Sequence, residues 1–592
     1  ALAGVAVVGA VIGMIQAAGA VRDGEQELRA AASALRRGDV EDASDALARS
    51  RDHLAAAASA LGRPWTRPAL AVPVLGQHVD SITTIADEAT ELAGSASTSV
   101  AQINVDSLRV RNGVIDLSAI EILETPFSDT FAALSDMSDV LSDARDPWLL
   151  WPVGSGVDEL LAEVDDLRRQ TATGGAAARL APAMLGGDGR RTYFVAFTTP
   201  AESRGLGGFM GTWAEVRADG GRLDVVRTGQ TAELIRSYRP TTLRGPDDYL
   251  ARYGRFGAGV DGEPAAVDFW SNYTISPDLP SVAEIARQLY PQSGGREIDG
   301  VIAVDVFGIS RFLELTGPIN VPEIDGRVDA GNAVEYLLRG QYAEIADDDV
   351  RDDVLERITE SLLDQVFNET LPGPRVLADT LGPSLADGHI AVWSFDRDDQ
   401  VLLTELGVSG AMPEPAPDGL AVTSTNAAGN KLDAYLRRSV SYEGVYDEET
   451  GALRTTATVR LTNTAPAVGL PADVSGNRTG LPPGTNRMYL SVYSPWSATA
   501  ARLDGEPVGV EPDRELGWRV YSRYVEIAPG DEAVLELEFT GELPEGTGYG
   551  LALHSPPLAL PDVVRLDIRD GDGDELLASH GPRVGTDVVR PG

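Results

Sequence analysis

The pattern of apolar residues changes twice along this chain, and these changes limit the folds that it can adopt. From residue 21 to 185, leucines and alanines recur at the spacing of amphipathic helices. From 186 to 415, short β-branched or aromatic runs alternate with helical segments, as in an α/β domain. After a linker at 416–438, residues 439–592 alternate with a period of two between Pro/Gly turns, which predicts a β-sandwich. Because 592 residues are also too many for one core, we expect a multidomain α+β protein.

The first twenty residues form an apolar stretch without a charged side chain. A helix of this length can span the hydrocarbon core of a bilayer. The alternative is the apolar core of a signal peptide, which is usually shorter, although Ala18-Gly19-Ala20 resembles a cleavage site. We therefore expect a retained transmembrane helix at 1–20 and a single-pass protein of the cell membrane. Residues 21–185 would then form an extracytoplasmic helical bundle or stalk.

The composition excludes several kinds of partner and chemistry. A formal net charge of −41 argues against a nucleic-acid partner, whose phosphates need cations to neutralise them. The chain has no cysteine, which excludes thiol catalysis, thiolate metal sites and disulfides. Its one lysine, Lys431, follows Asn430 and precedes Leu432. The chain therefore has no Walker A loop, and we expect no nucleotide site of that type.

The stretch 190–213 is the strongest candidate for a ligand site. An apolar strand at 193–197 is followed by Glu202 and Arg204, and then by several glycines. Glycines spaced so closely allow the backbone to approach another backbone or a ligand, and an arginine at a strand end can hold an anion. The alternative is a tight turn between two core strands, in which Arg204 pairs with Glu202.

A second group of polar residues lies at 425–438, in the predicted linker. A compact ammonium fits between amide and carbonyl oxygens where a planar guanidinium does not. We predict that this segment packs on the α/β domain and fixes the sandwich relative to it, with Lys431 partly buried and bonded to Asp433 or to backbone carbonyls. The alternative is a helix whose amides cap neighbouring loops. The predicted interface residues are Asn426, Asn430, Lys431 and Asp433.

Seven motifs resemble one bacterial family. They are Pro182-x-x-Leu185-Gly186, RTYFVAF at 191–197, Glu202-x-Arg204-x-x-Gly207-Gly208-Phe209-x-Gly211, Ser276-Pro277-Asp278-x-Pro280, Asp299-Gly300-Val301-Ile302-x-x-Asp305, Thr316-Gly317-Pro318 and Asn426-x-x-x-Asn430-Lys431-x-Asp433. Together they are similar to the domain of unknown function 4012 family of membrane-anchored proteins. This resemblance implies a family but says little about function.

The central region more distantly resembles the LytR-CpsA-Psr enzymes. The resemblance covers about 190 to 395 and lies mainly in residues 299–322, in the helix 333–339 and in Arg351. Those enzymes transfer a glycopolymer phosphate from a polyprenyl-pyrophosphate carrier to peptidoglycan, with arginines on the pyrophosphate and carboxylates on Mg²⁺. The resemblance implies an α/β domain of that type and a lipid-linked glycan or cell-wall glycopolymer as partner.

The same resemblance implies a set of site residues. The (pyro)phosphate would be bound by Arg204, Arg227, Arg339 and Arg351. We also expect the surrounding pocket to contain Glu202, Gly207, Gly208, Asn272 and Asp305, with Glu202 or Asp305 supplying Mg²⁺ ligands in place of the acid that those enzymes carry. We predict that Arg204, Arg227 and Arg339 converge on one pocket at the edge of the sheet.

One departure from those enzymes leaves the function open. Where they carry Ser-Asp-Thr after the first strand, this chain has Gly208-Phe209-Met210-Gly211, so a metal-binding acid is missing. Two functions remain: a phosphotransferase of the cell envelope that acts on polyprenyl-(pyro)phosphate-linked glycopolymer, and a non-catalytic scaffold or glycan-binding protein. A sensory ectodomain is a third.

Overall fold

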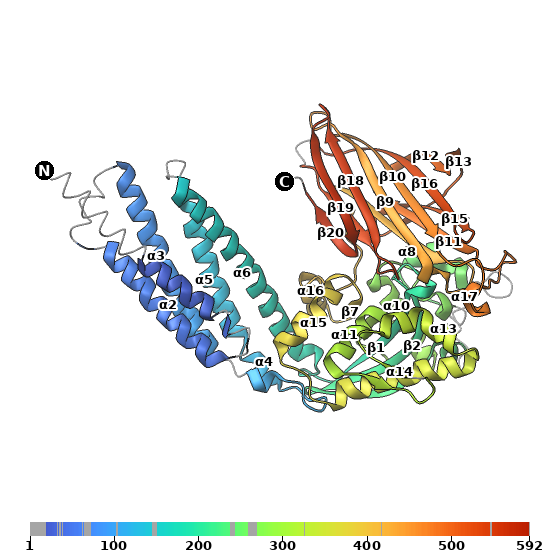
Figure 1. Cartoon of the computed structure of the whole chain (residues 1–592), viewed down its shortest axis with the longest axis horizontal. Coiled ribbons are helices and arrows are strands. Elements are labelled where there is room, and N and C mark those ends of the chain that lie inside the picture. Colours follow the sequence, from blue (N-terminus) through green and yellow to red (C-terminus); the bar gives the residue numbers. More distant parts are fainter. Residues whose placement is uncertain are drawn as a thin grey trace. The chain divides into compact units, whose positions relative to one another are not determined.

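The computed structural model describes residues 19–590 except for 32, 35, 36, 38, 62, 64–72, 102–104, 145–150, 237–242, 258–268, 325, 416 and 545–547. The chain divides into two compact units (Figure 1). Residues 1–110, 114–189 and 373–375 belong to the first unit, and the rest belong to the second.

The first unit is a bundle of amphipathic helices. Along the bundle, α2 packs on α3, α3 on α5, and α5 on α6. Leu134, Met137 and Leu141 of α5 form a buried cluster with Val157 and Val164 of α6, which is the apolar stripe that the helical spacing predicts. The helices are α2 (Val40–Leu61), α3 (Pro73–Ala101), α4 (Leu117–Glu121), α5 (Glu124–Asp143) and α6 (Trp151–Met184).

The predicted transmembrane helix requires a correction. Within the described ranges, no helix is both long and apolar enough to cross a membrane. This contradicts the expected anchor and the single-pass localisation that depended on it. The two longest helices of the described part each carry acidic side chains, which are costly in hydrocarbon: Asp87, Glu88 and Glu91 in α3, and Asp158, Glu159 and Glu163 in α6. Residues 1–18 of the expected anchor lie outside the described residues.

The second unit begins with a five-stranded sheet in the order β3-β2-β1-β4-β7. β1 and β4 are parallel, and the other neighbouring pairs are antiparallel. The strands are β1 (Arg191–Thr199), β2 (Phe209–Asp219), β3 (Arg222–Gln230), β4 (Gly300–Asp305) and β7 (Ile390–Ser394). The two-stranded ribbon β5 (Ile319–Asn320) and β6 (Arg327–Val328) lies apart from this sheet.

Helices cover both faces of this sheet, because side chains of β1 point alternately to each face. Phe194 and Ala196 join a cluster with α10, whereas Val195 and Phe197 join a cluster with α11 and α14. The result is a three-layered α/β domain. Its helices are α7 (Thr231–Arg236), α8 (Asp247–Tyr253), α10 (Leu279–Gln292), α11 (Val306–Thr316), α12 (Ala333–Glu335), α13 (Gln341–Glu344), α14 (Asp348–Asn368), α15 (Pro374–Ala386) and α16 (Arg397–Glu405).

The rest of the second unit is the β-sandwich. A seven-stranded sheet, β13-β12-β16-β10-β9-β18-β19, packs on a six-stranded sheet, β14-β15-β11-β8-β17-β20, through one large apolar cluster. The elements are β8 (Asp418–Asn426), β9 (Leu436–Tyr446), β10 (Ala452–Asn463), α17 (Ala472–Ser475), β11 (Asn486–Ser494), β12 (Ser497–Leu503), β13 (Glu506–Pro507), β14 (Glu511–Glu515), β15 (Trp518–Ile527), β16 (Glu532–Glu542), β17 (Leu551–Ser555), β18 (Asp562–Asp570), β19 (Glu575–Arg583) and β20 (Gly585–Val589).

The six-stranded sheet is also buried on its other face, where it contacts the α/β domain. Arg252 of α8 donates to Ser491 and Ser522 in that sheet, and the hydroxyl of Tyr253 lies 3.1 Å from that of Tyr493. Burial on both faces explains why β8 carries no period-two pattern: all of its residues are buried.

The predicted linker at 416–438 therefore differs from the structure. Residues 418–426 are β8, and residues 436–438 begin β9. Between the two strands lie a loop and a single 3-10 turn at Leu432–Tyr435. The alternative interpretation of 425–438 as a helix is wrong, because the segment consists of the end of β8, a loop, that single 3-10 turn and the start of β9.

Candidate functional site

A cavity of about 500 Å³ lies between the α/β domain and the sandwich, within the second unit. Its walls combine cations, aromatic rings and amides with a single carboxylate. The lining residues are Glu202, Arg204, Phe209, Phe256, Ser271, Asn272, Ile275, Thr425, Asn426, Ala427, Ala428, Gly429, Lys431, Arg478, Arg487, Tyr489 and Tyr524. A polar, partly aromatic concavity of this size suits a small ligand.

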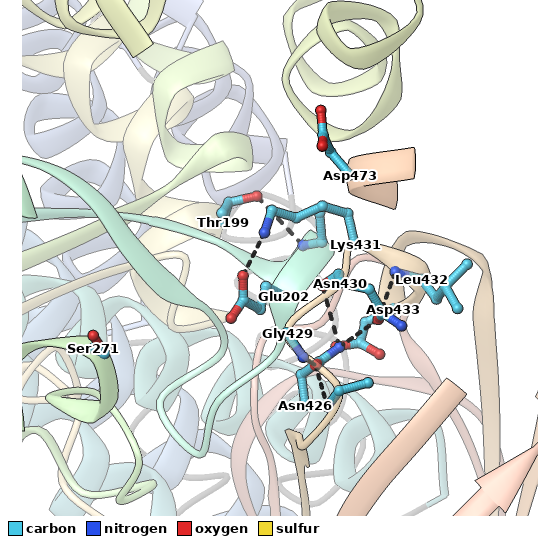
Figure 2. Close-up of polar contacts among 12 residues, drawn as sticks. Thr199, Glu202, Ser271, Asn426, Gly429, Asn430, Lys431, Leu432, Asp433 and Asp473 are labelled. Atoms are coloured by element: carbon cyan, nitrogen blue, oxygen red, sulfur yellow. Dashed lines mark hydrogen bonds and ion pairs between the residues drawn. The ribbon is translucent and has the colours of Figure 1, made fainter. Parts of the chain in front are cut away.

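Glu202 is held between two cations. The 3-10 turn Pro200–Glu202 follows β1 directly and places the carboxylate at the end of the strand. One oxygen accepts from Arg204 Nη2 at 2.9 Å. The other accepts from Lys431 Nζ at 2.5 Å, as Figure 2 shows. Burial alone raises the pKa of Glu202, but the two neighbouring positive charges and their hydrogen bonds lower that pKa to about 2. Glu202 is therefore ionised at neutral pH.

Arg204 is buried and has several partners besides Glu202. Its Nη1 donates to the carbonyl of Ser203 at 2.9 Å, and its Nη2 reaches the carbonyl of Ser271 at 3.3 Å. The guanidinium also lies 5.5 Å from the ring centroid of Phe209. Nε has no hydrogen-bond partner among the described residues. The side chain is thus fixed in the cavity wall with part of its donor capacity unused.

Asp433 joins the two halves of the second unit. It accepts from the backbone N and the hydroxyl of Ser203, at 2.8 and 3.0 Å, and Ser203 belongs to the α/β domain. It also accepts from the amides of Asn426 and Asn486 in the sandwich, at 2.9 and 2.8 Å. Burial raises the pKa of Asp433, although these hydrogen bonds counteract the shift. An acceptor with four donors from both domains fixes their relative position.

The loop between β8 and the 3-10 turn is shaped by asparagines. The side-chain oxygen of Asn426 accepts from the backbone N of Ala428 and Gly429, at 3.0 and 2.8 Å, while its amide donates to Asn430 Oδ1 at 3.0 Å. Gly429 has a φ of 68°, a conformation that favours glycine. In Figure 2, Lys431 extends from this loop towards Glu202, while Asn426, Asn430 and Asp433 contact one another.

The structure thus brings the predicted interface residues together and packs them on the α/β domain. Lys431 is partly buried, with 21% of its side chain exposed. Its predicted partner was wrong: Lys431 binds Glu202 rather than Asp433 or a carbonyl. The reason is that Asp433 already accepts four hydrogen bonds, whereas Glu202 has one oxygen left by Arg204.

The structure does not bring the predicted phosphate-binding arginines together. Arg227 of β3 donates to the carbonyl of Gly294 and lies 5.3 Å from the ring of Trp213, in the cluster on the α10 face. Arg339 follows Leu337 and Leu338, which belong to the cluster on the opposite face. The expected convergence of Arg204, Arg227 and Arg339 is therefore not found.

Arg339 and Arg351 have structural partners outside the cavity lining. Arg339 pairs with Glu335 at 2.5 Å, donates to the carbonyl of Ala434 and lies over the ring of Tyr435. Arg351 donates to the carbonyl of Ile345 at 2.9 Å and to Asp473 of α17 at 3.0 Å, and it also pairs with Asp348. Both arginines connect the α/β domain to the sandwich.

The predicted glycines pack against backbone rather than against a ligand. A Cβ on Gly208 would lie 2.3 Å from the carbonyl carbon of Thr199. Gly207, with a φ of 114°, faces Pro557 of the sandwich, whose carbonyl oxygen a Cβ would meet at 2.7 Å. Together with the Glu202–Arg204 pair, these contacts fit the alternative of a tight turn between core strands.

The remaining predicted pocket residues are separated. Asn272 lines the cavity and donates to the carbonyl of Phe256 at 3.2 Å. Asp305 lies outside the cavity lining: it caps α11 by accepting from the backbone N of Phe307 and Gly308, and it contacts His389 Nδ1 at 2.6 Å. Burial by itself lowers the pKa of His389, but the charge of Asp305 raises it overall.

Glu202 and Asp305 do not fit the expected role as Mg²⁺ ligands. Mg²⁺ needs an octahedron of oxygen donors. Both oxygens of Glu202 face cations, and those of Asp305 face an imidazole and two backbone N–H groups. Among the described residues, no group of three His, Cys, Asp or Glu side chains is arranged to hold a metal ion.

Sequence reasoning missed the sandwich side of the cavity. Arg478 follows α17, Arg487 and Tyr489 lie on β11, and Tyr524 lies on β15. Arg487 and Tyr489 are two residues apart on one strand and so share a face, which was the available signal. That face could not be assigned to a cavity without knowing that the sheet packs on a second domain.

Comparison with known proteins gives one family match. No curated protein matches the chain. Residues 188–342, about a quarter of the 592, match the family described as protein of unknown function, DUF4012. The match begins just before β1 and ends within α13, so it covers Glu202, Arg204 and most of the α/β domain. The family resemblance indicated by the motifs is therefore supported over residues 188–342.

Proposed function

We propose that the second unit binds a glycan linked through phosphate or pyrophosphate to a polyprenyl carrier, and that it does not transfer that glycan. One observation carries the proposal: Arg204, Lys431, Arg478 and Arg487 all line one cavity that contains a single carboxylate. This excess of positive charge occurs in a chain with a formal net charge of −41. The proposal concerns the glycosyl phosphate group that such glycans carry.

The charges of the cavity favour a phosphate or pyrophosphate. Glu202 balances only one of its two cationic neighbours, Arg204 and Lys431. Arg487 has Glu526 at 3.3 Å, whereas Arg478 adds a further positive charge. Bidentate guanidinium groups match the geometry of phosphate oxygens, and partial burial strengthens their attraction to an anion.

Binding without transfer follows from the state of Glu202. A general base works best with a pKa near the working pH, whereas the pKa of Glu202 is about 2 because Arg204 and Lys431 offset the effect of its burial. The carboxylate is also enclosed by those cations, so it does not offer Mg²⁺ a free ligand. We therefore assign Glu202 to positioning the two cations.

The proposal is tested by calorimetric titration of the full chain with a short-chain polyprenyl-pyrophosphate-linked N-acetylglucosamine at low salt. We expect saturable binding that weakens as salt increases. Arg478→Glu should weaken this binding at least tenfold, since it reverses a charge at the ligand. The control is Arg565→Glu on β18, an exposed arginine that does not line the cavity. Equal affinities of the two variants, or release of polyprenyl phosphate by the unaltered protein, would contradict the proposal.

A second function, a rigid scaffold without a ligand, is favoured by the hydrogen bonds of Asp433. Four donors from the α/β domain and the sandwich fix this buried carboxylate. A scaffold requires the two domains to unfold together in one transition, and it requires no effect of the glycan on that transition. An increase in the unfolding temperature with the glycan probe would instead support the binding function.

A further inference from the structure

The cavity carries two chemically different walls. One is aromatic and consists of Phe256, Tyr489 and Tyr524, which we call the aromatic wall. The other contains Arg478, next to the loop at Gly429. Building on the proposed function, we infer that the aromatic wall takes the face of the first sugar ring and that Arg478 takes the phosphate attached to it. The ligand recognised is then a glycosyl phosphate, rather than a free pyrophosphate or a neutral glycan.

The aromatic wall is continuous and held in place. The ring centroids of Phe256 and Tyr489 are 5.8 Å apart, and those of Tyr489 and Tyr524 are 4.9 Å apart. The hydroxyl of Tyr489 accepts from Arg255 at 2.8 Å and donates to Glu511 at 3.0 Å. Because these contacts fix the ring before a ligand arrives, little conformational entropy is lost on binding.

Tyr524 is the accessible part of this wall. It is 38% exposed, although it lies in a strand of the sandwich and lines the cavity. The guanidinium of Arg487 lies 4.4 Å from its ring centroid, which supports the ring from one side. An exposed aromatic ring at a cavity suits the C–H face of a pyranose, which is apolar, while the hydroxyl groups of the sugar face polar neighbours.

Arg478 differs from the other cations of the cavity. Arg204 and Lys431 pair with Glu202, and Arg487 has Glu526. No side-chain hydrogen bond or ion pair engages Arg478 among the residues that the structure describes. Its backbone N donates to the carbonyl of Ala428 at 2.9 Å, which anchors the residue beside the loop. Arg478 is therefore the cation that a phosphate can bind without breaking an existing pair.

If each wall binds one part of the ligand, the sugar and the phosphate should contribute separately to the affinity. We would titrate the full chain with glucose 1-phosphate, methyl α-glucoside, inorganic pyrophosphate and uridine monophosphate. Glucose 1-phosphate should bind most tightly, because it alone offers a pyranose and a phosphate together. Tyr524→Ala should weaken its binding about fivefold to tenfold and should leave pyrophosphate binding unchanged. Arg478→Gln should weaken both about tenfold or more.

A conservative variant and an unfolding measurement distinguish the loss of a ligand contact from misfolding of the protein. Tyr524→Phe retains the ring and should bind glucose 1-phosphate within about twofold of the unaltered protein, and thermal unfolding of each variant tests its fold. The inference is overturned if pyrophosphate or uridine monophosphate binds more tightly than glucose 1-phosphate. It is also overturned if Tyr524→Ala weakens pyrophosphate and glucose 1-phosphate equally.

These outcomes separate the inference from the function on which it rests. If none of the phosphate-bearing probes binds, both the inference and the proposed function are overturned. If the probes bind through Arg478 but Tyr524 has no effect on glucose 1-phosphate, the anion-binding function stands and the assignment of the aromatic wall fails.

Discussion

Asp418 of β8 accepts hydrogen bonds from the hydroxyl of Tyr442 on β9, at 3.1 Å to each of its oxygens. The two strands belong to opposite sheets of the sandwich. Trp496 Nε1 and the hydroxyl of Tyr549 donate to the same carboxylate, at 2.6 and 2.8 Å. Complete burial raises the pKa of Asp418 to about 6, although these donors counteract the shift. The sandwich therefore contains an acid that titrates well above the usual range.

Asp418 should make the stability of the second unit depend on pH. Its folded pKa of about 6 exceeds its ordinary value of 3.8, so the unfolded chain releases the proton first. The free energy of unfolding should fall as the pH rises from about 4 to about 6, by on the order of 2–3 kcal/mol, and then level off. Asp418→Asn should remove this decrease in urea unfolding measured across that range. An unchanged pH profile in Asp418→Asn would contradict the assignment.

Glu202 should contribute a pH dependence of the opposite sign. Because its folded pKa of about 2 lies below the ordinary 4.5, its stabilisation is present above pH 4.5 and is lost as the pH falls towards 2. Glu202→Gln leaves Arg204 and Lys431 without their carboxylate, so we expect it to be destabilising by about 2–4 kcal/mol at pH 7. The difference should shrink in chemical unfolding at pH 3.

Glu532→Gln is the matched control for Glu202→Gln. Glu532 pairs with Arg460 at 2.5 Å, but both side chains are about half exposed. An exposed pair of this kind contributes little, so this variant should change the free energy of unfolding by less than about 0.5 kcal/mol. Equal effects of the two substitutions at pH 7 would remove the distinction between the buried and the exposed pair.

Lys431→Arg should be more disruptive than a conservative change at the surface. Lys431 Nζ binds one oxygen of Glu202 while Arg204 binds the other, and a planar guanidinium is broader than an ammonium. We expect a loss of about 1–2 kcal/mol in thermal unfolding. A change within about 0.5 kcal/mol would mean that arginine serves equally well at this position.

Two neighbouring glycines should respond very differently to alanine. Gly208→Ala places a Cβ 2.3 Å from the backbone of Thr199, and backbone cannot move away cheaply, so the free energy of unfolding should fall by more than about 3 kcal/mol. Gly211→Ala meets nothing within 4 Å, and it should be neutral or slightly stabilising. Denaturant unfolding of both variants checks the pair, and a neutral Gly208→Ala would show that the close approach is not required.

The sequence predicts best those elements whose burial is one-sided. The helices of the first unit each have one buried face, and so do β10 and β16. Their apolar residues therefore recur at helical spacing or with a period of two, and the sequence alone identifies them as helices and strands. β8 could not be recognised, since it is buried on both faces and consists largely of small polar residues. A strand of that kind depends on a second domain that a local pattern does not reveal.

In the candidate site, too, the sequence identified single residues but not the contacts that depend on how the domains pack. Glu202, Arg204 and Lys431 stood out because an acid, a base and the only lysine are conspicuous in the sequence. Their pairing across 229 positions, however, depends on how the sandwich docks on the α/β domain. Arg227 and Arg339 failed to meet because they lie on opposite faces of the sheet, and spacing alone does not specify a face.

The position of Lys431 allows the cavity to be probed by chemical modification. It is the only lysine of the chain and is partly exposed at the cavity wall. An amine-directed acylating reagent therefore has one side-chain target, and that target borders the proposed ligand. The extent of acylation at Lys431, read by mass spectrometry, becomes a direct gauge of how fully the cavity is occupied, without any substitution in the protein.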